Sequence, residues 1–409
     1  MLEELFNLSR HFLKNYNRAY IRYFLKKYNL HSRFSIITGQ RGVGKSTALI
    51  QKLLVYAGND ILSKKILYIQ ADHFLIGKYS LYEISEEFYN KGGEIICFDE
   101  IHKYPDWSIE LKSIYDTFMD LIILASGSSA LEIYKGSHDL SRRAIIYKMQ
   151  GMSFREFLEL SLNKNFVSYS LKTILEEHEQ IANKIIEKLA NKKILSLFED
   201  YLTYGYYPYY LEYKDKALFY IALEQNIHTT IEADLLSIYP SLTGISIKKI
   251  KKLLSFIAGC VPFIPDIKKL KEILEIGDER TLKTYLKYLE DAGIILQFAK
   301  SRQSLKGLGK PEKIYLNNTC QLFALKGTTK ENIGTVREIF FVNMLYSEHN
   351  LSIPNKGDFL IDGELLFEIG GKKKSYSQIK DIQKSFLAID DIESGFGNKI
   401  PLWLFGFLY

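Results

Sequence analysis

The chain has 409 residues, of which 47% are hydrophobic and 25% charged, and its net charge is +6. This length exceeds one ordinary hydrophobic core, so we expect two or three domains, and the composition excludes a disordered or fibrous chain. With 8 prolines and no Gly/Ser-rich run, long disordered linkers are not expected. The N-terminal residues lack a signal-peptide pattern, and no stretch reaches the ~18 apolar residues of a membrane span.

The cysteines and the charge distribution narrow the class of protein further. Cys97, Cys260 and Cys320 have no metal or redox spacing, as expected for the reducing cytoplasm. Residues 241–313 contain 15 Lys/Arg and 8 Asp/Glu, a net +7, so the other residues sum to +6 − 7 = −1. Such a localised basic segment is typical of nucleic-acid binding, although a solvated basic face needs no partner.

The first motif is a glycine-rich loop between an apolar strand at residues 34–37 and a helical pattern at 48–57. It fits the phosphate-binding consensus at each required position and consists of Gly39, Gln40, Arg41, Gly42, Val43, Gly44, Lys45, Ser46 and Thr47. Glycines let the backbone N–H groups face phosphates, and the helix N-terminus adds positive potential. We therefore predict that ATP and Mg²⁺ bind here, with Lys45 on the β- and γ-phosphates and Ser46 on the metal.

A second motif follows the predicted buried strand at residues 94–98. Asp99 is predicted to hold the magnesium ion, directly or through water, and Glu100 to act as general base on the attacking water. The alternative is that both carboxylates cap the next helix. Together with the loop, this pair favours hydrolysis of ATP over binding alone.

Short β-rich runs at residues 65–70, 121–125 and 143–149, separated by helical segments, predict a parallel α/β sheet. Ser126 or Ser128, after the fourth strand, could contact the γ-phosphate and the attacking water, and Ser128 is taken as a catalytic candidate. A helix-capping serine is equally consistent with the pattern. Arg142 or Arg143, before the fifth strand, could reach a γ-phosphate in cis or across a subunit boundary, unless it is a surface arginine.

The basic segment predicts a helix at 267–274, a second helix at 279–291 that Asp278 caps, and a strand at 294–298. On the second helix, Leu282, Tyr285, Leu286 and Leu289 form the predicted buried stripe, opposite Arg280, Lys283, Thr284 and Lys287. A basic loop containing Arg302 and Lys306 follows. This is the layout of a winged helix-turn-helix, for which double-stranded DNA is the expected partner and a lid or protein-docking role the alternative.

The last eighty residues carry acids in the order of a PD-(D/E)xK nuclease core, which they resemble. Glu338 lies on a predicted helix at 335–348, Asp358 opens a strand, and Glu368 ends the next strand. The expected lysine position is Gly370, so Lys372 would serve only if the backbone bulges. We therefore predict a nuclease-like fold that the missing lysine leaves inactive, and a closing strand at residues 401–409.

These motifs resemble archaeal-type AAA ATPases, which are related to the STAND signalling ATPases and carry a C-terminal domain of unknown function. The resemblance rests on GQRGVGKST, DEIHKYPDW (99–107), ASGSSA, MSFREFL (152–158), YLTYGYYPYYLE (201–212), KIYLNN (313–318) and GTVRE (334–338). It implies an ATPase core followed by an aromatic-glycine-proline hinge. The chain departs from the family pattern where Arg142, instead of a small residue, precedes Arg143.

The expected fold class is α/β: a P-loop NTPase domain with an AAA-like parallel sheet, a helical and winged-helix region, and a restriction-endonuclease-like α/β domain. The predicted boundaries are 1–158, 159–240 (hinge or lid), 241–313 (winged helix) and 314–409. The expected function is an ATP-driven switch coupled to DNA binding. The alternatives are a STAND-like signalling switch without nucleic acid, acting through a protein partner or homo-oligomer, and an ATP-regulated nuclease. No membrane partner is expected.

Overall fold

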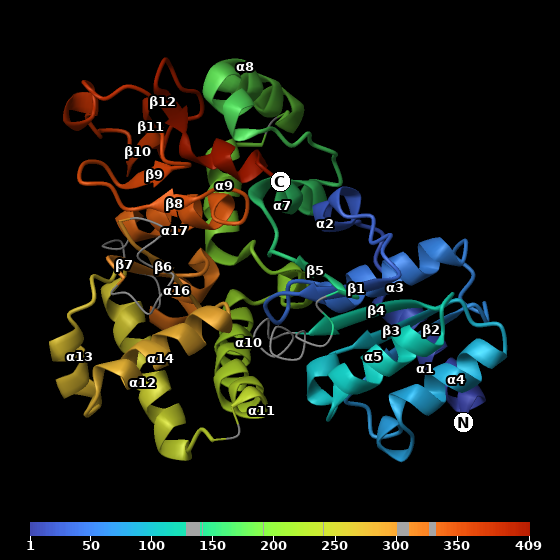
Figure 1. The fold of residues 1–409 in the computed structure, drawn as a ribbon. Coiled ribbons are helices and arrows are strands. Elements are labelled where there is room, and N and C mark those ends of the chain that lie inside the picture. The colour runs from blue at the N-terminus through green and yellow to red at the C-terminus, as the bar shows by residue number, and fades with distance from the viewer. Residues whose placement is uncertain (128–139, 141, 191, 240, 301–310, 327–332) are drawn as a thin grey trace. The chain divides into compact units, whose positions relative to one another are not determined.

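A computed structural model describes residues 1–127, 140, 142–190, 192–239, 241–300, 311–326 and 333–409. They divide into two compact units (Figure 1). The first unit is Met1–Gly151 with Ala233–Ser241, and the second is Met152–Glu232 with Leu242–Tyr409. Among the described residues, none of the helices combines the length and the apolar character needed to cross a bilayer.

The first unit is built from a five-stranded sheet and flanking helices. Its strands are β1 (Phe34–Thr38), β2 (Ile66–Gln70), β3 (Ile95–Asp99), β4 (Ile122–Gly127) and β5 (Ile145–Lys148). Its helices are α1 (Leu2–Tyr16), α2 (Tyr23–Lys27), α3 (Lys45–Tyr56), η1 (Ile76–Lys78), α4 (Leu81–Asn90), η2 (Ile101–Lys103), α5 (Trp107–Thr117) and α11 (Leu235–Ile238).

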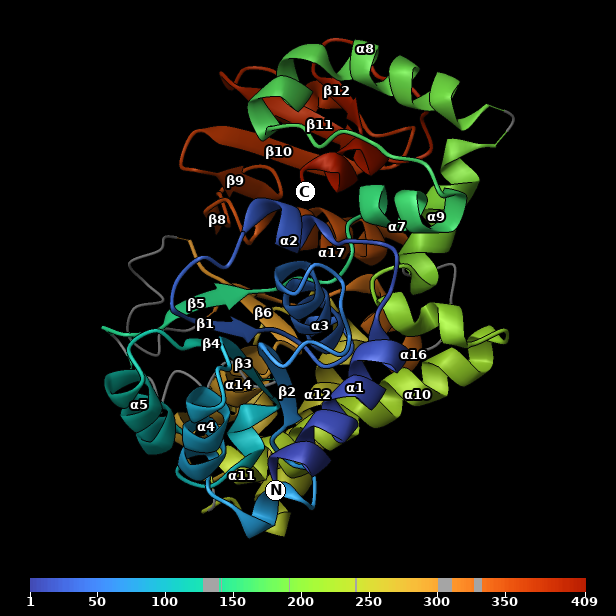
Figure 2. The ribbon, with the colours of Figure 1, turned by 90° about the vertical axis from the view of Figure 1, so that its right-hand side faces the viewer.

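The sheet has the order β2-β3-β4-β1-β5, and every neighbouring pair is parallel. Its strands are near-continuous apolar runs because helices cover both faces. Helix α3 lies on one face and α4 and α5 on the other, as Figure 2 shows from the side. Helix α1 runs along the edge at β2, where the Ser9 hydroxyl accepts a hydrogen bond of 3.0 Å from the Tyr68 backbone N–H. The predicted parallel α/β sheet is confirmed.

The second unit begins with helices and ends in a second sheet. The helical part comprises α7 (Phe154–Leu162), α8 (Leu171–Leu189), α9 (Ile194–Tyr204), η3 (Pro208–Glu212), α10 (Lys216–Thr229), the π-helical turn η4 (Thr230–Asp234), α12 (Gly244–Cys260), α13 (Ile267–Leu274) and α14 (Glu279–Asp291). Then come the antiparallel pair β6 (Ile295–Phe298) and β7 (Lys313–Leu316), followed by α16 (Thr319–Lys326) and α17 (Ile333–Leu345). The last two residues of η4, Ala233 and Asp234, belong to the first unit.

The C-terminal sheet has the order β12-β11-β10-β9-β8. Its elements are β8 (Leu351–Ser352), β9 (Phe359–Ile361), β10 (Leu365–Gly370), η6 (Tyr376–Gln378), β11 (Ser385–Ile389), β12 (Lys399–Pro401) and η7 (Leu402–Phe407). Strand β9 pairs antiparallel with both β8 and β10, whereas β11 pairs parallel with both β10 and β12. This mixed α/β arrangement agrees with the fold class expected for the C-terminal region.

The prediction of a closing strand at 401–409 is wrong, because residues 402–407 form the 3₁₀ helix η7. All six of its residues are buried, so the segment lacks the alternation that distinguishes a half-buried strand from a helix. Gly406 permits a close approach, since a Cβ atom there would lie 2.4 Å from the Cβ atom of Phe154. Residues 402–407 are therefore buried in the core between helices and sheet, and they do not extend the sheet.

An aromatic cluster forms the centre of the second unit. Phe341 on α17 is fully buried, and its ring lies 4.9 Å from Phe405, 5.1 Å from Phe367 and 6.0 Å from Phe359. Helix, sheet and η7 therefore meet at one side chain.

We predict that Phe341→Ala lowers the free energy of unfolding of the second unit by about 3–5 kcal/mol, because it leaves a cavity among three rings. The matched control Phe396→Ala, at a side chain that is 79% exposed, should cost less than about 0.5 kcal/mol. Urea unfolding followed by circular dichroism measures both. Equal effects of the two variants would contradict this packing.

Candidate functional site

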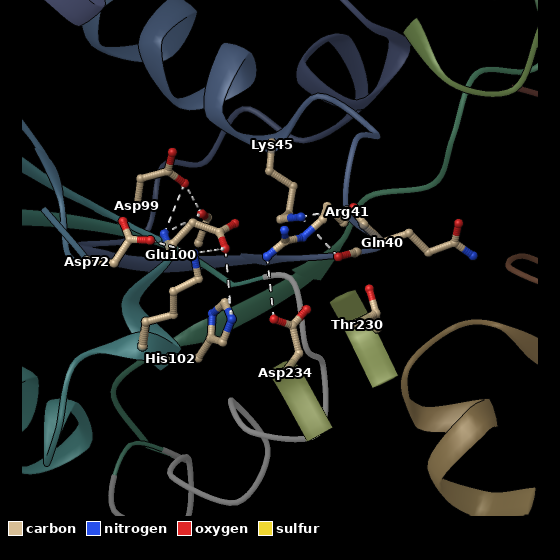
Figure 3. A network of polar contacts seen from close by, with 12 residues as sticks. Gln40, Arg41, Lys45, Asp72, Asp99, Glu100, His102, Thr230 and Asp234 are labelled. Carbon is tan, nitrogen blue, oxygen red and sulfur yellow. Dashed lines mark hydrogen bonds and ion pairs between the residues drawn. The ribbon is translucent and has the colours of Figure 1, made fainter. Parts of the chain in front are cut away.

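The loop between β1 and α3 is held in a conformation that requires glycine. Gly44 has a φ of 102°, and a Cβ atom on Gly39 would lie 2.4 Å from the carbonyl oxygen of Met149. The Lys45 ammonium donates to two carbonyls of the loop itself, Gly39 at 3.0 Å and Gln40 at 2.9 Å (Figure 3). The loop thus curls around its own lysine at the carboxyl edge of the sheet.

Arg22, the residue directly before α2, stabilises this loop through hydrogen bonds. Its buried guanidinium donates to the carbonyls of Val43 at 2.7 Å, Gly151 at 2.8 Å and Gln150 at 3.1 Å. The arginine therefore joins the glycine-rich loop to the segment after β5. Sequence analysis missed this residue because a single arginine outside any motif carries no local signal.

Asp99, the last residue of β3, is the centre of a buried hydrogen-bond cluster. The Tyr68 hydroxyl donates to Asp99 Oδ2 at 2.5 Å, and the Ser126 hydroxyl donates to Asp99 Oδ1. Tyr68 also hydrogen-bonds Ser46, and burial together with Asp99 raises the pKa of Tyr68 far above its usual range. The two predicted metal ligands, Ser46 and Asp99, therefore meet at one protonated phenol.

Glu100 has a left-handed backbone conformation, with φ 53° and ψ 37°, which is uncommon for a residue with a side chain. Its N–H donates to the Ser126 hydroxyl at 3.3 Å. Its carboxylate lies 3.5 Å from the Lys103 ammonium and 3.9 Å from His102 Nε2. Lys103 also contacts Asp72 at 2.5 Å. Figure 3 shows Glu100 within this network, between Asp99 and His102.

Burial controls the protonation of two groups in the network. It lowers the pKa of Lys45, although Glu100 and Asp99 act in the opposite direction. It also lowers the pKa of His102 to about 4, against the attraction of Asp234. His102 is therefore neutral at physiological pH, whereas for Lys45 the nearby carboxylates of Glu100 and Asp99 oppose the effect of burial on its pKa.

The predicted arginines lie at the far edge of the sheet. Ile145 of β5 pairs with Ser35 at the start of β1, whereas Lys148 pairs with Thr38 beside the loop. Arg143 is five residues before Lys148, about 16 Å away along an extended chain, and its guanidinium contacts Asp116 at 2.8 Å. The register therefore contradicts a role for Arg143 in cis. Arg142 is exposed at the same edge, and Ser128 lies outside the described residues.

Helix α14 has the two faces that the sequence predicts. Asp278 caps it by accepting from the N–H groups of Arg280 and Thr281, and the apolar stripe Leu282, Tyr285, Leu286 and Leu289 is buried. Lys283 contacts Glu279 at 2.9 Å and Lys287 contacts Asp291 at 3.3 Å, so acids of the same helix partly neutralise the basic face. Thr284 lies half-buried beside them; Arg302 and Lys306 fall outside the described residues.

The acids of the C-terminal region have polar or charged neighbours. Glu368 contacts Lys374 at 2.6 Å, and Glu338 accepts from the Tyr315 hydroxyl at 2.5 Å. The lysine at Glu368 is thus Lys374 and not Lys372, because the Lys374 stem fills the space where a side chain on Gly370 would stand.

Asp358 accepts from the Ile369 backbone N–H at 2.7 Å, and burial raises its pKa and that of Glu338. Across the described residues, no group of three or more His, Cys, Asp or Glu is arranged to hold a metal ion.

Comparison with known proteins agrees with the first unit's geometry. Residues 31–158 match the family model of the AAA domain. This domain belongs to a class of P-loop ATPases, so the match supports ATP binding at the level of the family. Residues 195–332 match a domain of unknown function (DUF8612), which agrees with the resemblance drawn from the sequence.

One curated relative and several solved structures are also similar. The uncharacterized protein MJ1637 of Methanocaldococcus jannaschii is 29% identical over 206 residues, which are 48% of this chain and 43% of that protein. The chain thus matches less than half the length of this relative. The Walker-type ATPase PABY2304 of Pyrococcus abyssi has a TM-score of 0.40 at 13% identity, covering 74% of this chain and 94% of that one. AMPPCP-bound DnaA of Aquifex aeolicus has a TM-score of 0.27 at 15% identity, covering 71% and 89%.

We predict that His102 makes the first unit less stable in acid. The pKa of His102 is about 4 in the fold and near 6.5 when unfolded, so the unfolded state binds the proton first. Stability should therefore fall as pH drops from about 6.5 to about 4, by on the order of 3 kcal/mol. His102→Gln should remove this part of the pH dependence in urea titrations. An unchanged pH profile would contradict a buried neutral imidazole.

Proposed function

We propose that the AAA domain binds ATP with Mg²⁺ through residues 39–47 and hydrolyses it. The observation that carries the proposal is the convergence of Lys45, Ser46, Asp99 and Glu100 at the carboxyl edge of one parallel sheet. Ligands of open α/β sheets bind at this edge, and helix N-termini that point to it favour phosphate groups.

The donor set suits magnesium bound together with a nucleotide. Asp99 and the Ser46 hydroxyl are hard oxygen donors that share Tyr68 as a hydrogen-bond partner. Magnesium is commonly bound through one or two carboxylates plus substrate phosphates instead of an all-protein cage. When bound, the ion supplies charge neutralisation at the β- and γ-phosphates.

Each residue of the chain then has a distinct role. Lys45 exchanges the carbonyls of Gly39 and Gln40 for phosphate oxygens, which compensate its buried charge better than neutral carbonyls do. Glu100 accepts the proton of the attacking water, because its strained backbone directs the carboxylate to the edge of the sheet. Ser126 joins the N–H of Glu100 to the Asp99 carboxylate and so fixes their spacing.

We predict that Glu100→Gln lowers the turnover of ATP by about 10²–10⁴-fold, while ATP affinity stays within about threefold. Lys45→Ala should instead weaken ATP binding itself, since it removes the phosphate contact. The matched control is Glu94→Gln, directly before the start of β3, which should leave turnover unchanged. Phosphate release and fluorescent-nucleotide binding measure the two quantities. Normal turnover by Glu100→Gln would exclude Glu100 as the general base.

As a second function, we infer that residues 241–313 form a winged helix that binds double-stranded DNA, so that ATP turnover is coupled to DNA. The support is the net charge of +7 in this segment and the solvent-facing Arg280 and Lys287 on α14. A helix of this kind enters the major groove while nearby cations contact phosphates. A protein-signalling switch without nucleic acid, and an arginine acting in trans within an oligomer, are the alternatives.

We predict that the double variant Arg280→Ala, Lys287→Ala weakens DNA binding and reduces the slope of log Kd against log salt by about 1 for each lost phosphate contact. The control is Lys192→Ala with Lys214→Ala, which removes two exposed charges from other parts of the second unit. Fluorescence anisotropy over a salt series measures both. Unchanged binding and slope in the α14 variant would favour the signalling switch.

A further inference from the structure

A short piece of the second half of the chain belongs to the ATPase unit. Residues Ala233–Ser241 group with Met1–Gly151, whereas the residues before and after them, up to Glu232 and from Leu242, belong to the other unit. The chain therefore passes into the ATPase unit and out again. It does so at a π-helical turn, Thr230–Asp234, a rare conformation that is frequent at functional sites.

This segment brings a buried carboxylate to the glycine-rich loop. Asp234 is only 3% exposed, and its Oδ1 lies 3.5 Å from Nη2 of Arg41, the third residue of the loop. Figure 3 shows the Asp234 carboxylate pointing to the Arg41 guanidinium. Its charge also acts on Lys45 and His102, where it favours the protonated forms.

The carboxylate of Asp234 is an anion inside a site whose cations suit phosphates. Burying an ionised carboxylate is costly unless cations compensate it, and here Arg41 and Lys45 provide that compensation. Incoming β- and γ-phosphates would need the same cations and would repel the carboxylate. Asp234 and the phosphates therefore compete for one set of positive charges.

We propose that Asp234 is an internal competitor of the ATP phosphates, which sets nucleotide affinity and releases residues 233–239 from the loop when ATP binds. This inference rests on the proposed ATP site. The chain on both sides of this segment belongs to the second unit. Loss of the Arg41–Asp234 contact on ATP binding would therefore be transmitted to the second unit through the polypeptide chain. The contact thereby acts as an electrostatic latch that phosphate opens.

The test compares Asp234→Asn with wild type in titrations with ATP and with AMP. Removing the charge should strengthen ATP binding about tenfold or more and leave AMP binding nearly unchanged, because AMP lacks the β- and γ-phosphates. The matched control Asp120→Asn removes an exposed carboxylate just before β4, at the opposite edge of the sheet, and should change neither affinity. Hydrogen exchange gives a second measurement: ATP should speed exchange of residues 233–239 in wild type, whereas Asp234→Asn should exchange quickly without ATP.

The outcomes separate this inference from the proposed function. Weaker or unchanged ATP binding by Asp234→Asn, or an equal gain for AMP, overturns the latch while wild-type ATP binding leaves the ATP site intact. Failure of both wild type and Asp234→Asn to bind ATP refutes the ATP site and the latch with it. Binding by Asp234→Asn alone would support the latch in its strongest form.

Discussion

The parallel register of β1, β3 and β4 determines where the polar groups of the site lie. Strands that run in the same direction end at the same edge, so the loop after Thr38, the carboxylates after Phe98 and the hydroxyl of Ser126 come together there. Each would otherwise be an isolated polar group next to a buried strand. The helices on both faces leave this edge as the place where buried polar side chains can find polar partners.

Charge compensation is the second constraint on the site. The buried Lys45 and Asp99 cannot be separated from their neighbours without leaving an uncompensated charge, and Tyr68, Ser126 and Glu100 supply the surrounding hydrogen bonds and countercharges. The loop satisfies its own lysine through two backbone carbonyls, those of Gly39 and Gln40. Under the proposed function, nucleotide binding would exchange the carbonyl partners of Lys45 for phosphate oxygens, while the side chain keeps its place.

Local patterns in the sequence predicted those parts of the fold that depend on local chemistry. The glycine loop, the five strands of the first unit, the Asp278 cap and both faces of α14 follow from turn residues and periodicity, and the structure has them. The run at 402–407 was misassigned because a fully buried segment has no period to read. Contacts between residues far apart in sequence, such as Arg22 with Gly151 or Arg41 with Asp234, leave no local trace. Lys374 was likewise hidden, since only the folded turn places its stem over Gly370.

The most direct test of the central claim is an equilibrium titration of the full wild-type chain with ATP, with and without Mg²⁺. A loop that holds its lysine ready for phosphate, next to Ser46 and Asp99, predicts saturable binding of one ATP per chain that tightens when Mg²⁺ is present. Calorimetry gives the stoichiometry and the affinity together. Absence of binding, or binding that Mg²⁺ leaves unchanged, would contradict the assignment of these residues to a magnesium–nucleotide site.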